Sequence, residues 1–355
     1  MPEELSNSET ELRKAKGRRI GRHLLRIFLP IVALLLLCLA IGVFIFFKSG
    51  AAGSLIESQF RGKLQRMGLA FNAEEFRLEL NPLRLILKNA AFNDAKTGEK
   101  IFFIRDAKIL LSIDNLLAWQ ISRDVSVRNT EIEGAELWIK FDANGRSNLA
   151  NLVEDTAESK INLKYDSANF SLRGAVVHFG DLGRRLDAEA RNFSFYAKPS
   201  SDENSADRLR FEIEAAASDS VFSYDANPVE NISLHLRAIA DAAGAEISLL
   251  KLDSPVGAAE LTGRVLSWSP FRYRLNVNSS ADFSAISSIF PLGTRLNGNG
   301  SFKGIVSGEG EKYSVDGAIE SGEIIADAVY LKGLNISGTA AGVNQTYEIN
   351  GTALA

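Results

Sequence analysis

The distribution of apolar residues divides the chain into two unlike parts. Residues 27–47 form an unbroken apolar run, IFLPIVALLLLCLAIGVFIFF. As a helix rising about 1.5 Å per residue, this run would span roughly 30 Å, the thickness of the hydrocarbon core of a bilayer. The pattern therefore predicts a transmembrane anchor, and the Lys- and Arg-rich residues 1–26 before it predict a cytoplasmic tail.

A cleavable signal peptide is the alternative for this segment, because signal peptides also join a basic region to an apolar one. Their apolar region is about 7–15 residues long, shorter than this run, and the sequence that follows, KSGAAGSLIESQF, has no clean small-x-small cleavage site. We therefore expect the anchor to be retained. Residues 50–67 predict a short amphipathic helix, since Ile56, Phe60, Leu64 and Met67 recur at helical spacing.

From residue 69 to 355 the apolar period changes to two, which predicts β-strands with one apolar face. We expect about eighteen to twenty strands in a meander. Helical patterns are almost absent: the two candidates are residues 284–290, which Pro291 would end, and the polar residues 148–159. The clearest alternation holds Phe76, Leu78 and Leu80; Leu83, Leu85 and Leu87; Ala107, Ile109, Leu111 and Ile113; Ala135, Leu137, Ile139 and Phe141; Ile161, Leu163 and Tyr165; Phe193 and Phe195; Phe211 and Ile213; Ile232, Leu234 and Leu236; Tyr273, Leu275 and Val277; and Tyr313 and Val315.

The apolar face of such a meander needs a partner, and three are open: a second sheet, a coil of the sheet around its own axis, or a ligand in a curled groove. The spacing of the apolar segments lacks the repeat of about twenty residues that is typical of a β-helix. More than about fifteen meander strands also exceed one sandwich domain. Alternation indicates that one face is buried but does not identify the layer that covers it. A core filled by protein side chains therefore remains the alternative to a groove filled by a ligand.

Charge and composition narrow the function classes. The chain has 40 Lys and Arg against 44 Asp and Glu, for a net charge of −4; residues 1–26 hold seven of the basic and four of the acidic residues, which leaves a net charge of −7 for residues 27–355. Without an outward basic field, nucleic-acid binding is not expected. The single cysteine, Cys38, lies inside the apolar run, so the exported part has no disulfide.

No catalytic or metal-binding constellation stands out in the sequence. His23, His178 and His235 have no ligand at metal-site spacing, and we read His235 as an outward-facing strand residue. The adjacent carboxylates Glu74–Glu75 and Asp202–Glu203 would point to opposite faces of a strand. We therefore predict a protein that is not an enzyme, with no cofactor and no metal.

One stretch carries a family resemblance. Residues 81–152 read as a strand, a turn from Asp94 to Gly98, a strand ending in LSIDNLL, a strand on VSVRNTEIEGA, and a closing segment, WIKFDANGRSNLANL. The closing segment is similar to a D-x-x-G-x-x-N-hydrophobic-x-x-L signature, met here by Asp142, Gly145, Asn148 and Leu152. This pattern resembles the N-terminal region of the AsmA-like superfamily (AsmA/TamB-type envelope proteins), and LNGNGSFKG, YSVDG and GLNISG at 296–304, 313–317 and 333–338 resemble its degenerate glycine-containing strands.

The resemblance implies a mainly β protein anchored in the bacterial inner membrane, with the bulk of the chain in the periplasm. Its fold would be a long curled antiparallel β-sheet groove, a β-taco like that of the chorein-type bridge proteins. Its function would be phospholipid transport to the outer membrane, with phospholipid and the membrane as partners. The implied organisation is a basic tail (1–26), the anchor (27–47), the amphipathic helix (50–67) and a periplasmic groove domain (69–355), which we expect to continue past the chain end.

Elementary energetics agree with a lipid conduit. A two-chain lipid exposes roughly thirty methylenes, and at about 0.8 kcal/mol each their transfer into water costs on the order of 25 kcal/mol. An apolar track removes that cost. The candidate lipid-facing residues are Phe76, Leu78, Leu80, Leu85, Leu87, Ile109, Leu111, Ile113, Leu137, Ile139, Phe141, Leu163, Phe193, Phe195, Phe211, Ile213, Leu234 and Leu275.

Two other functions remain open from the sequence. The first is a non-enzymatic envelope or outer-membrane assembly factor, which would act by contact with an outer-membrane protein partner. The second, less favoured, is an anchored carbohydrate-processing enzyme, which would need two convergent carboxylates that the sequence does not offer.

Overall fold

The computed structural model describes residues 51–112, 124–152, 162–164, 167–200, 209–290, 293–310, 312–343 and 346–354. The predicted tail and anchor, residues 1–47, lie outside this part. Among the described residues, none of the helices is both long and apolar enough for a membrane span. The chain divides into two units, residues 1–59 and 60–355, and the second holds the sheet.

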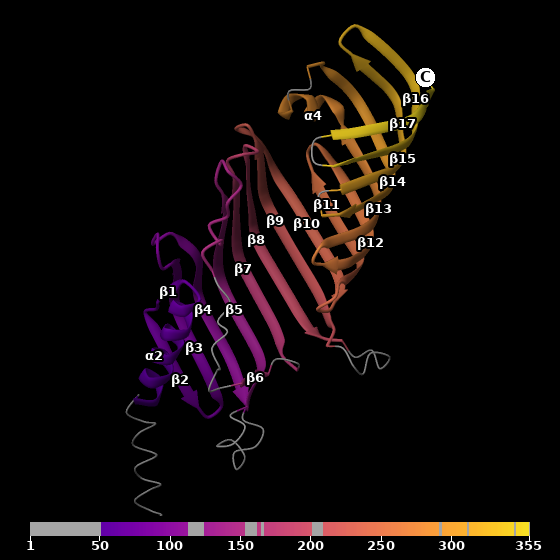
Figure 1. The fold of residues 1–355 in the computed structure, drawn as a ribbon. Coiled ribbons are helices and arrows are strands. Elements are labelled where there is room, and N and C mark those ends of the chain that lie inside the picture. The colour runs from indigo at the N-terminus through magenta and orange to yellow at the C-terminus, as the bar shows by residue number, and fades with distance from the viewer. Residues whose placement is uncertain are drawn as a thin grey trace, which may run out of the picture. The chain divides into compact units, whose positions relative to one another are not determined.

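The described chain consists almost entirely of long strands in one sheet, drawn in Figure 1. Its two helices are α2 (Ala51–Arg66) and α4 (Phe283–Ile289). The strands are β1 (Leu69–Asn72), β2 (Glu75–Leu80), β3 (Leu83–Asp94), β4 (Lys100–Ser112), β5 (Asp124–Phe141), β6 (Asn162–Lys164), β7 (Asn169–Asp181), β8 (Leu186–Pro199), β9 (Phe211–Tyr224), β10 (Asn227–Ala240), β11 (Ala245–Ser254), β12 (Gly257–Trp268), β13 (Phe271–Asp282), β14 (Leu296–Glu309), β15 (Lys312–Ala326), β16 (Val329–Val343) and β17 (Thr346–Leu354).

The sheet is a meander of antiparallel neighbours with one exception, which corrects the prediction of a wholly antiparallel sheet. Strand β5 pairs in parallel with β6 and with β7. Parallel neighbours need a connection of a dozen or more residues, and residues 142–168 separate β5 from β7 in the sequence. The alternating pattern alone could not reveal this, since it is the same for parallel and antiparallel neighbours.

Two of the three helical segments predicted after the anchor have a counterpart. Helix α2 occupies the segment with helical apolar spacing, and α4 occupies the segment before Pro291. Asp282 caps α4, because its carboxylate accepts hydrogen bonds from the backbone N–H groups of Ser284 and Ala285 at 2.9 and 3.2 Å. The prediction of a helix over 148–159 is wrong for residues 148–152, which form turns; the rest lies outside the described residues.

Six strands contain a residue in the left-handed conformation near their middle. These residues have φ between 46° and 65° and lie in β3, β5 and β7 to β10: Asn89, Gly134, Gly174, Asn192, Asp219 and Asn231. Asn, Asp and Gly are the residues that adopt this conformation at least cost. We call this line across the sheet the crease.

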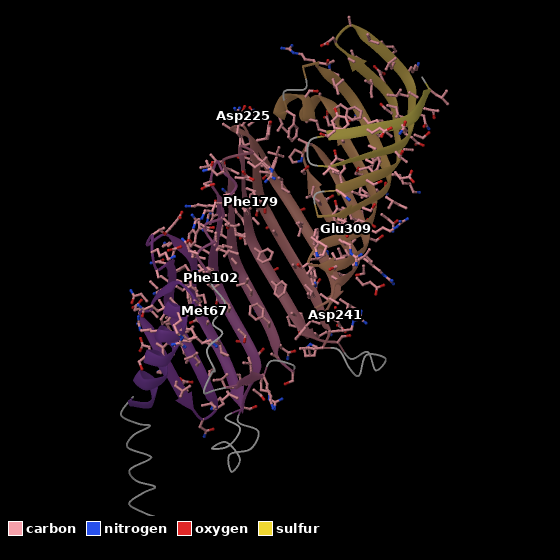
Figure 2. All side chains as sticks on the ribbon, viewed as in Figure 1. Met67, Phe102, Phe179, Asp225, Asp241 and Glu309 are labelled. Atoms are coloured by element: carbon pink, nitrogen blue, oxygen red, sulfur yellow. The ribbon has the colours of Figure 1, made fainter. Side chains whose placement is uncertain are left out.

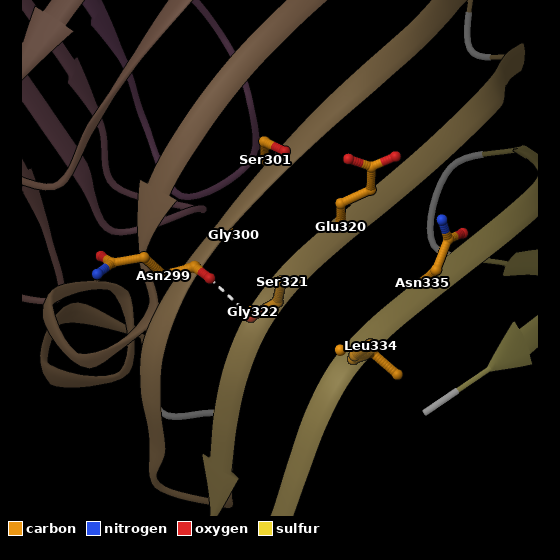
Figure 3. Close-up of a pocket in the computed structure, with 9 residues that line it drawn as sticks. Asn299, Gly300, Ser301, Glu320, Ser321, Gly322, Leu334 and Asn335 are labelled. Atoms are coloured by element: carbon orange, nitrogen blue, oxygen red, sulfur yellow. Dashed lines mark hydrogen bonds between the residues drawn. The ribbon is translucent and has the colours of Figure 1, made fainter.

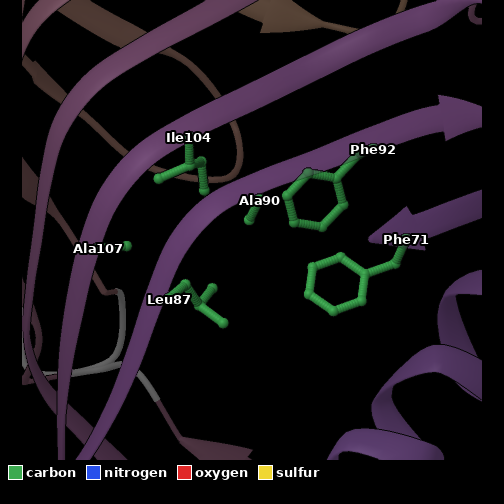
Figure 4. Packing of buried hydrophobic residues seen from close by; sticks show 6 residues of the cluster. All are labelled: Phe71, Leu87, Ala90, Phe92, Ile104 and Ala107. Carbon is green, nitrogen blue, oxygen red and sulfur yellow. The ribbon is translucent and has the colours of Figure 1, made fainter. Parts of the chain in front are cut away.

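Apolar residues occupy every second position of these strands, and at the crease they shift from odd to even positions or the reverse. We call this shift a change of parity. In β3 they are Leu85 and Leu87 before Asn89, and Ala90 and Phe92 after it. Leu85, Leu87, Ala90 and Phe92 nevertheless belong to one packed cluster, shown in part in Figure 4, so they share one face of the sheet. The left-handed residue therefore keeps the apolar side chains on one face while the strand bends.

The packed cluster lies at the N-terminal end of the sheet. Phe71, Leu87, Ala90, Phe92, Ile104 and Ala107 are buried in it, and Phe60 and Leu64 of α2 pack against it. The Phe60 ring meets the Phe71 ring edge-on, with 5.1 Å between centroids. Each Leu or Phe fully buried there contributes roughly 1.5–3 kcal/mol. In the described part of the chain no large side chain is completely buried, as expected for a sheet that is mostly one layer thick.

The opposite face carries cross-strand ion pairs. Examples are Lys88–Glu75 at 2.7 Å, Lys198–Glu212 at 2.8 Å, and Arg264–Glu246 at 3.4 Å, all between partly exposed side chains. Exposed pairs of this kind contribute roughly 0–1 kcal/mol each, so they keep this face in water rather than hold the fold together. We call it the polar face and the other the apolar face.

Candidate functional site

The apolar face is ordered into rows that cross the sheet at right angles to the strands. Directly paired residues of neighbouring strands share a face, so the strand register defines each row. Row A runs through Phe76, Leu87, Ala107, Ile132, Leu172, Phe195, Ala215, Leu236, Leu250, Leu261, Val277, Gly304, Gly317, Gly338 and Gly351. Row B runs through Leu78, Leu85, Ile109, Thr130, Phe170, Ala197, Ile213, Ala238, Ile247, Gly263, Leu275, Val306, Val315, Ala340 and Ile349.

Both rows are continuous, and neither contains a charged residue. Thr130 carries the only polar side chain in the two rows. At about 4.8 Å per strand, a row of this extent is roughly 70 Å long. Beyond the crease, shorter rows such as Phe92, Phe102, Leu137, Val177 and Ala190 widen the apolar surface. The side chains of this surface are drawn in Figure 2.

Most of the apolar face is not covered by another layer of described residues. The helix α2 covers its beginning through Phe60 and Leu64, and α4 contacts β10, β13 and β14 near one edge. Between these two covers, Leu172, Phe195 and Leu236 of row A are half-buried rather than buried. A continuous row of large, half-exposed apolar side chains is typical of a binding surface.

Every predicted lipid-facing residue with a described side chain lies on this one face. Row A contains Phe76, Leu87 and Phe195, and row B contains Leu78, Leu85, Ile109, Ile213 and Leu275. The other members lie in parallel rows, as their register partners show: Leu111 with Val127, Leu137 with Phe102, Ile139 with Phe179, Phe141 with Asp181, Phe193 with Ala175, Phe211 with Ala240, and Leu234 with Leu252. Leu80 and Leu163 belong to β2 and β6, but their side chains, and all of Ile113, lie outside the described residues.

The sequence reading missed many members of the same rows. Strand β7 supplies Phe170 and Leu172, and β11 and β12 supply Ile247 and Leu261. Their alternation is interrupted by Gly174 in β7 and by register shifts between β10, β11 and β12. A search that allowed the apolar parity to change at Gly, Asn or Asp would have found the β7 members.

The family-type turn has a structural role. The Asp142 carboxylate accepts hydrogen bonds from the backbone N–H groups of Asn144 and Arg146, and Gly145 has a φ of 75°. The Asn148 side chain accepts a hydrogen bond from the Lys140 N–H and donates one to the Trp138 carbonyl. These two bonds satisfy backbone polar groups of β5.

The segment after this turn is fixed to the end of β3. The Asn151 amide donates a hydrogen bond of 2.8 Å to the Asp94 carboxylate, which is buried. This bond, followed by those from the backbone N–H groups of Thr97 and Lys96, lowers the pKa of Asp94. The half-buried Leu152 ends this segment, next to Gly68. These contacts explain the motif by folding alone.

Both histidines of the described sheet pair with carboxylates on the polar face. His178 Nδ1 lies 3.1 Å from Glu189, and its ring stacks on Trp138 with 5.2 Å between centroids. His235 Nε2 lies 3.0 Å from Glu214, so the prediction of an outward-facing strand histidine is confirmed. Among the described residues, no three His, Cys, Asp or Glu side chains converge as a metal site.

Two hollows in the described sheet offer no reactive group either. The first, of about 500 Å³, lies on β14–β16 beside the Ser321 hydroxyl, which donates to the Asn299 carbonyl at 2.7 Å (Figure 3). Glu320 is the only ionisable residue that lines it. The second, of about 780 Å³, spans β8–β12, and its charges are held in the pairs Lys198–Glu212, Glu214–Arg237 and Arg264–Glu246. The apolar face is therefore the candidate functional site.

In comparisons with known proteins, no protein-family model and no curated protein matches this chain.

Proposed function

We propose that this protein transfers lipids, with the acyl chains lying on the apolar face of its sheet. The observation that supports this most directly is the unbroken course of rows A and B across fifteen strands, β2 to β5 and β7 to β17, while the large side chains of Leu172, Phe195 and Leu236 in row A stay half-exposed. A surface of this length and composition costs free energy in water, and an acyl chain of matching polarity removes that cost.

The crease and the bowed strands of Figure 1 support a curled groove rather than a flat sheet. Left-handed residues repeated at one level of β3, β5 and β7 to β10 bend each strand in the same place. The residues that follow three of them are small and buried: Ala90, Ala135 and Ala175. Small side chains at the bottom of a bend let its two walls approach each other.

The proposal also places the protein in a bacterial envelope. With residues 27–47 as an inner-membrane anchor and the sheet in the periplasm, the groove would carry phospholipid toward the outer membrane, as the resemblance to the AsmA-like superfamily implies. The role assigned to the protein is binding and passage of lipid, with no covalent step. The polar face, with its exposed ion pairs, would remain in water during this passage.

The test is native mass spectrometry of the full chain, purified gently from bacteria in detergent, together with two variants of neighbouring residues. Leu275→Arg places a guanidinium in row B, and Asn276→Arg places the same group on the polar face, where Asn276 is exposed. We expect co-purified phospholipid on the wild type and on Asn276→Arg, and at least a tenfold loss on Leu275→Arg, because a charge in an apolar track costs several kcal/mol.

Three outcomes would count against lipid transfer. They are a wild type without lipid, equal lipid on both variants, or a protein found on the apolar face in place of lipid. The last outcome would favour the assembly-factor function instead. Far-UV circular dichroism of both variants checks that the sheet is retained, so that loss of lipid is not loss of fold.

A further inference from the structure

A row of tyrosines lies on the apolar face where β13, β15 and β17 begin. We call this side of the sheet, formed by strand ends, the Tyr edge. In β13–β17 the register pairs Tyr273 with Gly308, Gly308 with Tyr313, Tyr313 with Gly342, and Gly342 with Tyr347. This row lies next to row B, since Tyr273 precedes Leu275 and Tyr313 precedes Val315 by two positions. We call it the Tyr row.

The tyrosine rings lie flat over the glycines of the row. A Cβ built at Gly308 would stand 2.6–2.8 Å from three ring and hydroxyl atoms of Tyr273. A Cβ at Gly342 would stand 2.5 Å from the Tyr313 hydroxyl. The missing side chain at these positions is therefore what lets each ring lie along the sheet with its hydroxyl above the neighbouring strand.

Trp268 and Phe271 continue the aromatic row at the β12–β13 turn. The Trp268 ring stacks on the Phe271 ring at 6.3 Å, and the Phe271 ring lies 5.4 Å from the Tyr273 ring. The Trp268 Nε1–H donates to the Asp241 carbonyl at 3.0 Å. Trp268 and Phe271 are each 46% exposed, so the row reaches the solvent at this edge, near Asp241 and Glu309 in Figure 2.

The opposite edge of the same strands is different. There the apolar face presents Ala281, Ala326 and Val329, and α4 packs beside them, with the Phe283 ring over Gly300. Tyr330 lies next to Val329 but points to the other face, where burial and the nearby Glu323 raise its pKa. Among the described residues of β12–β17, the tyrosine and tryptophan side chains on the apolar face are thus confined to one edge.

Charged side chains lie at the same strand ends as the Tyr row but on the polar face, because each is one position from a member of that row. Arg272, Glu309 and Lys312 are exposed and are direct cross-strand partners, Arg272 with Glu309 and Glu309 with Lys312. None of the three forms an ion pair with another residue in the described part of the chain. Two cations at this edge can meet a phosphate, and the carboxylate between them can meet an ammonium group.

Trp and Tyr are favoured where an apolar phase meets water, because the ring is apolar and its N–H or O–H needs a polar partner. In a glycerophospholipid this boundary is the glycerol ester region, between the acyl chains and the phosphate. Resting on the lipid-transfer function, we propose that glycerophospholipids lie across β13–β17 in one orientation. Their acyl chains occupy rows A and B, their ester groups lie at the Tyr row, and their headgroups leave over the edge that holds Arg272 and Lys312.

The experiment compares two photoactivatable phosphatidylethanolamines on the full chain, one with a diazirine on the headgroup and one with it at the acyl terminus. Labelled peptides are mapped by mass spectrometry. We expect the headgroup probe to label residues 268–273 and 308–313, and the acyl probe to label residues 275–279, 302–306 and 315–319. Equal or stronger headgroup labelling of the opposite turns, residues 254–258 and 326–330, would overturn the orientation.

The same experiment separates this inference from the proposed function. If the acyl probe labels none of the apolar face, lipid transfer itself fails. If it labels that face while the headgroup probe labels both edges equally, only the orientation fails.

Paired variants test the tyrosine hydroxyls. Tyr273→Phe with Tyr313→Phe keeps both rings and removes both hydroxyl groups, and Tyr196→Phe with Tyr330→Phe is the matched control on the polar face. We expect headgroup labelling at the Tyr edge to fall roughly fivefold in the first pair, as for a lost hydrogen bond, and to stay unchanged in the second. Unchanged labelling in the first pair, with acyl labelling intact, would contradict the role of the hydroxyls.

Discussion

The glycines of row A in β14–β17 make a sharp prediction about packing. Gly317 faces Gly304 across β14 and β15, and the Phe302 ring lies over both. A Cβ added at Gly317 would stand 2.6 Å from the Lys303 carbonyl oxygen, 2.7 Å from Phe302 Cε2 and 2.8 Å from Gly304 Cα. Two of these three atoms belong to backbone, so they cannot move aside as a flexible side chain would.

The same strand provides the control. Gly322 also lies in β15, has no positive φ, and has nothing within 4 Å of an added Cβ. Gly317→Ala and Gly322→Ala restrict the unfolded chain equally, so that contribution cancels in their comparison. Overpacking of a filled site costs about 1–3 kcal/mol, whereas an unobstructed Gly→Ala change is neutral or stabilises by about 0.4–1 kcal/mol. We therefore expect Gly317→Ala to be less stable than Gly322→Ala by roughly 2 kcal/mol.

Thermal unfolding followed by far-UV circular dichroism measures this difference on the full chain in detergent. At roughly 2–4 °C per kcal/mol, Gly317→Ala should melt roughly 4–8 °C below Gly322→Ala. Because a long sheet can open locally, hydrogen exchange of the β14 and β15 amides should show faster exchange in Gly317→Ala alone. Equal melting temperatures and equal exchange would refute the close packing of these strands.

Three further predictions concern the crease, a buried carboxylate and the helix cover. Gly134→Ala should lower the free energy of unfolding by roughly 1–2 kcal/mol in chemical denaturation, because Ala resists φ of 65° and its Cβ would displace the Arg105 guanidinium. Asn151→Ala should raise the pKa of Asp94, measured by NMR titration, because the variant loses the hydrogen bond that lowers it most. A carboxyl group with a lowered pKa in the folded state stabilises the fold at neutral pH, and this stabilisation is lost as the pH falls through the folded-state pKa. The wild type should therefore be more stable than the variant at neutral pH, and the two should converge at low pH. Phe60→Ala should cost roughly 2 kcal/mol and speed proteolysis of α2, because the ring leaves its edge-on contact in the cluster.

The period of two predicted the strands and their apolar face because each alternating segment records its own burial. Leu85 and Leu87, or Leu275 and Val277, are read correctly without reference to any neighbour. Strand register and order are relations between distant residues, so no single segment contains them. The parallel pairing of β5 with β7 is the clearest example, since neither strand has a pattern that specifies its neighbour.

The crease was hidden for a different reason. A residue such as Asn192 or Asp219 ends one alternating run and begins another with opposite parity, which looks like a turn between two short strands. Sequence reasoning therefore breaks one bent strand into two. The same effect hides part of the candidate site, since rows A and B take members from strands whose alternation is interrupted, such as Phe170 in β7 and Ile247 in β11.

The two faces together support the proposal that a lipid, rather than a protein core, covers this sheet. A sheet with one apolar face is stable when a second layer covers that face. In the described chain α2 supplies that layer at the beginning of rows A and B, and α4 contacts only β10, β13 and β14 near one edge. In the middle of row A the large side chains of Leu172, Phe195 and Leu236 stay half-exposed, and in β14–β17 row A is reduced to glycine. Glycine contributes no side chain to a protein core, and at Gly304 and Gly317 the Phe302 ring covers the strands instead. The rows are therefore suited to an apolar layer that the described part of the chain does not supply.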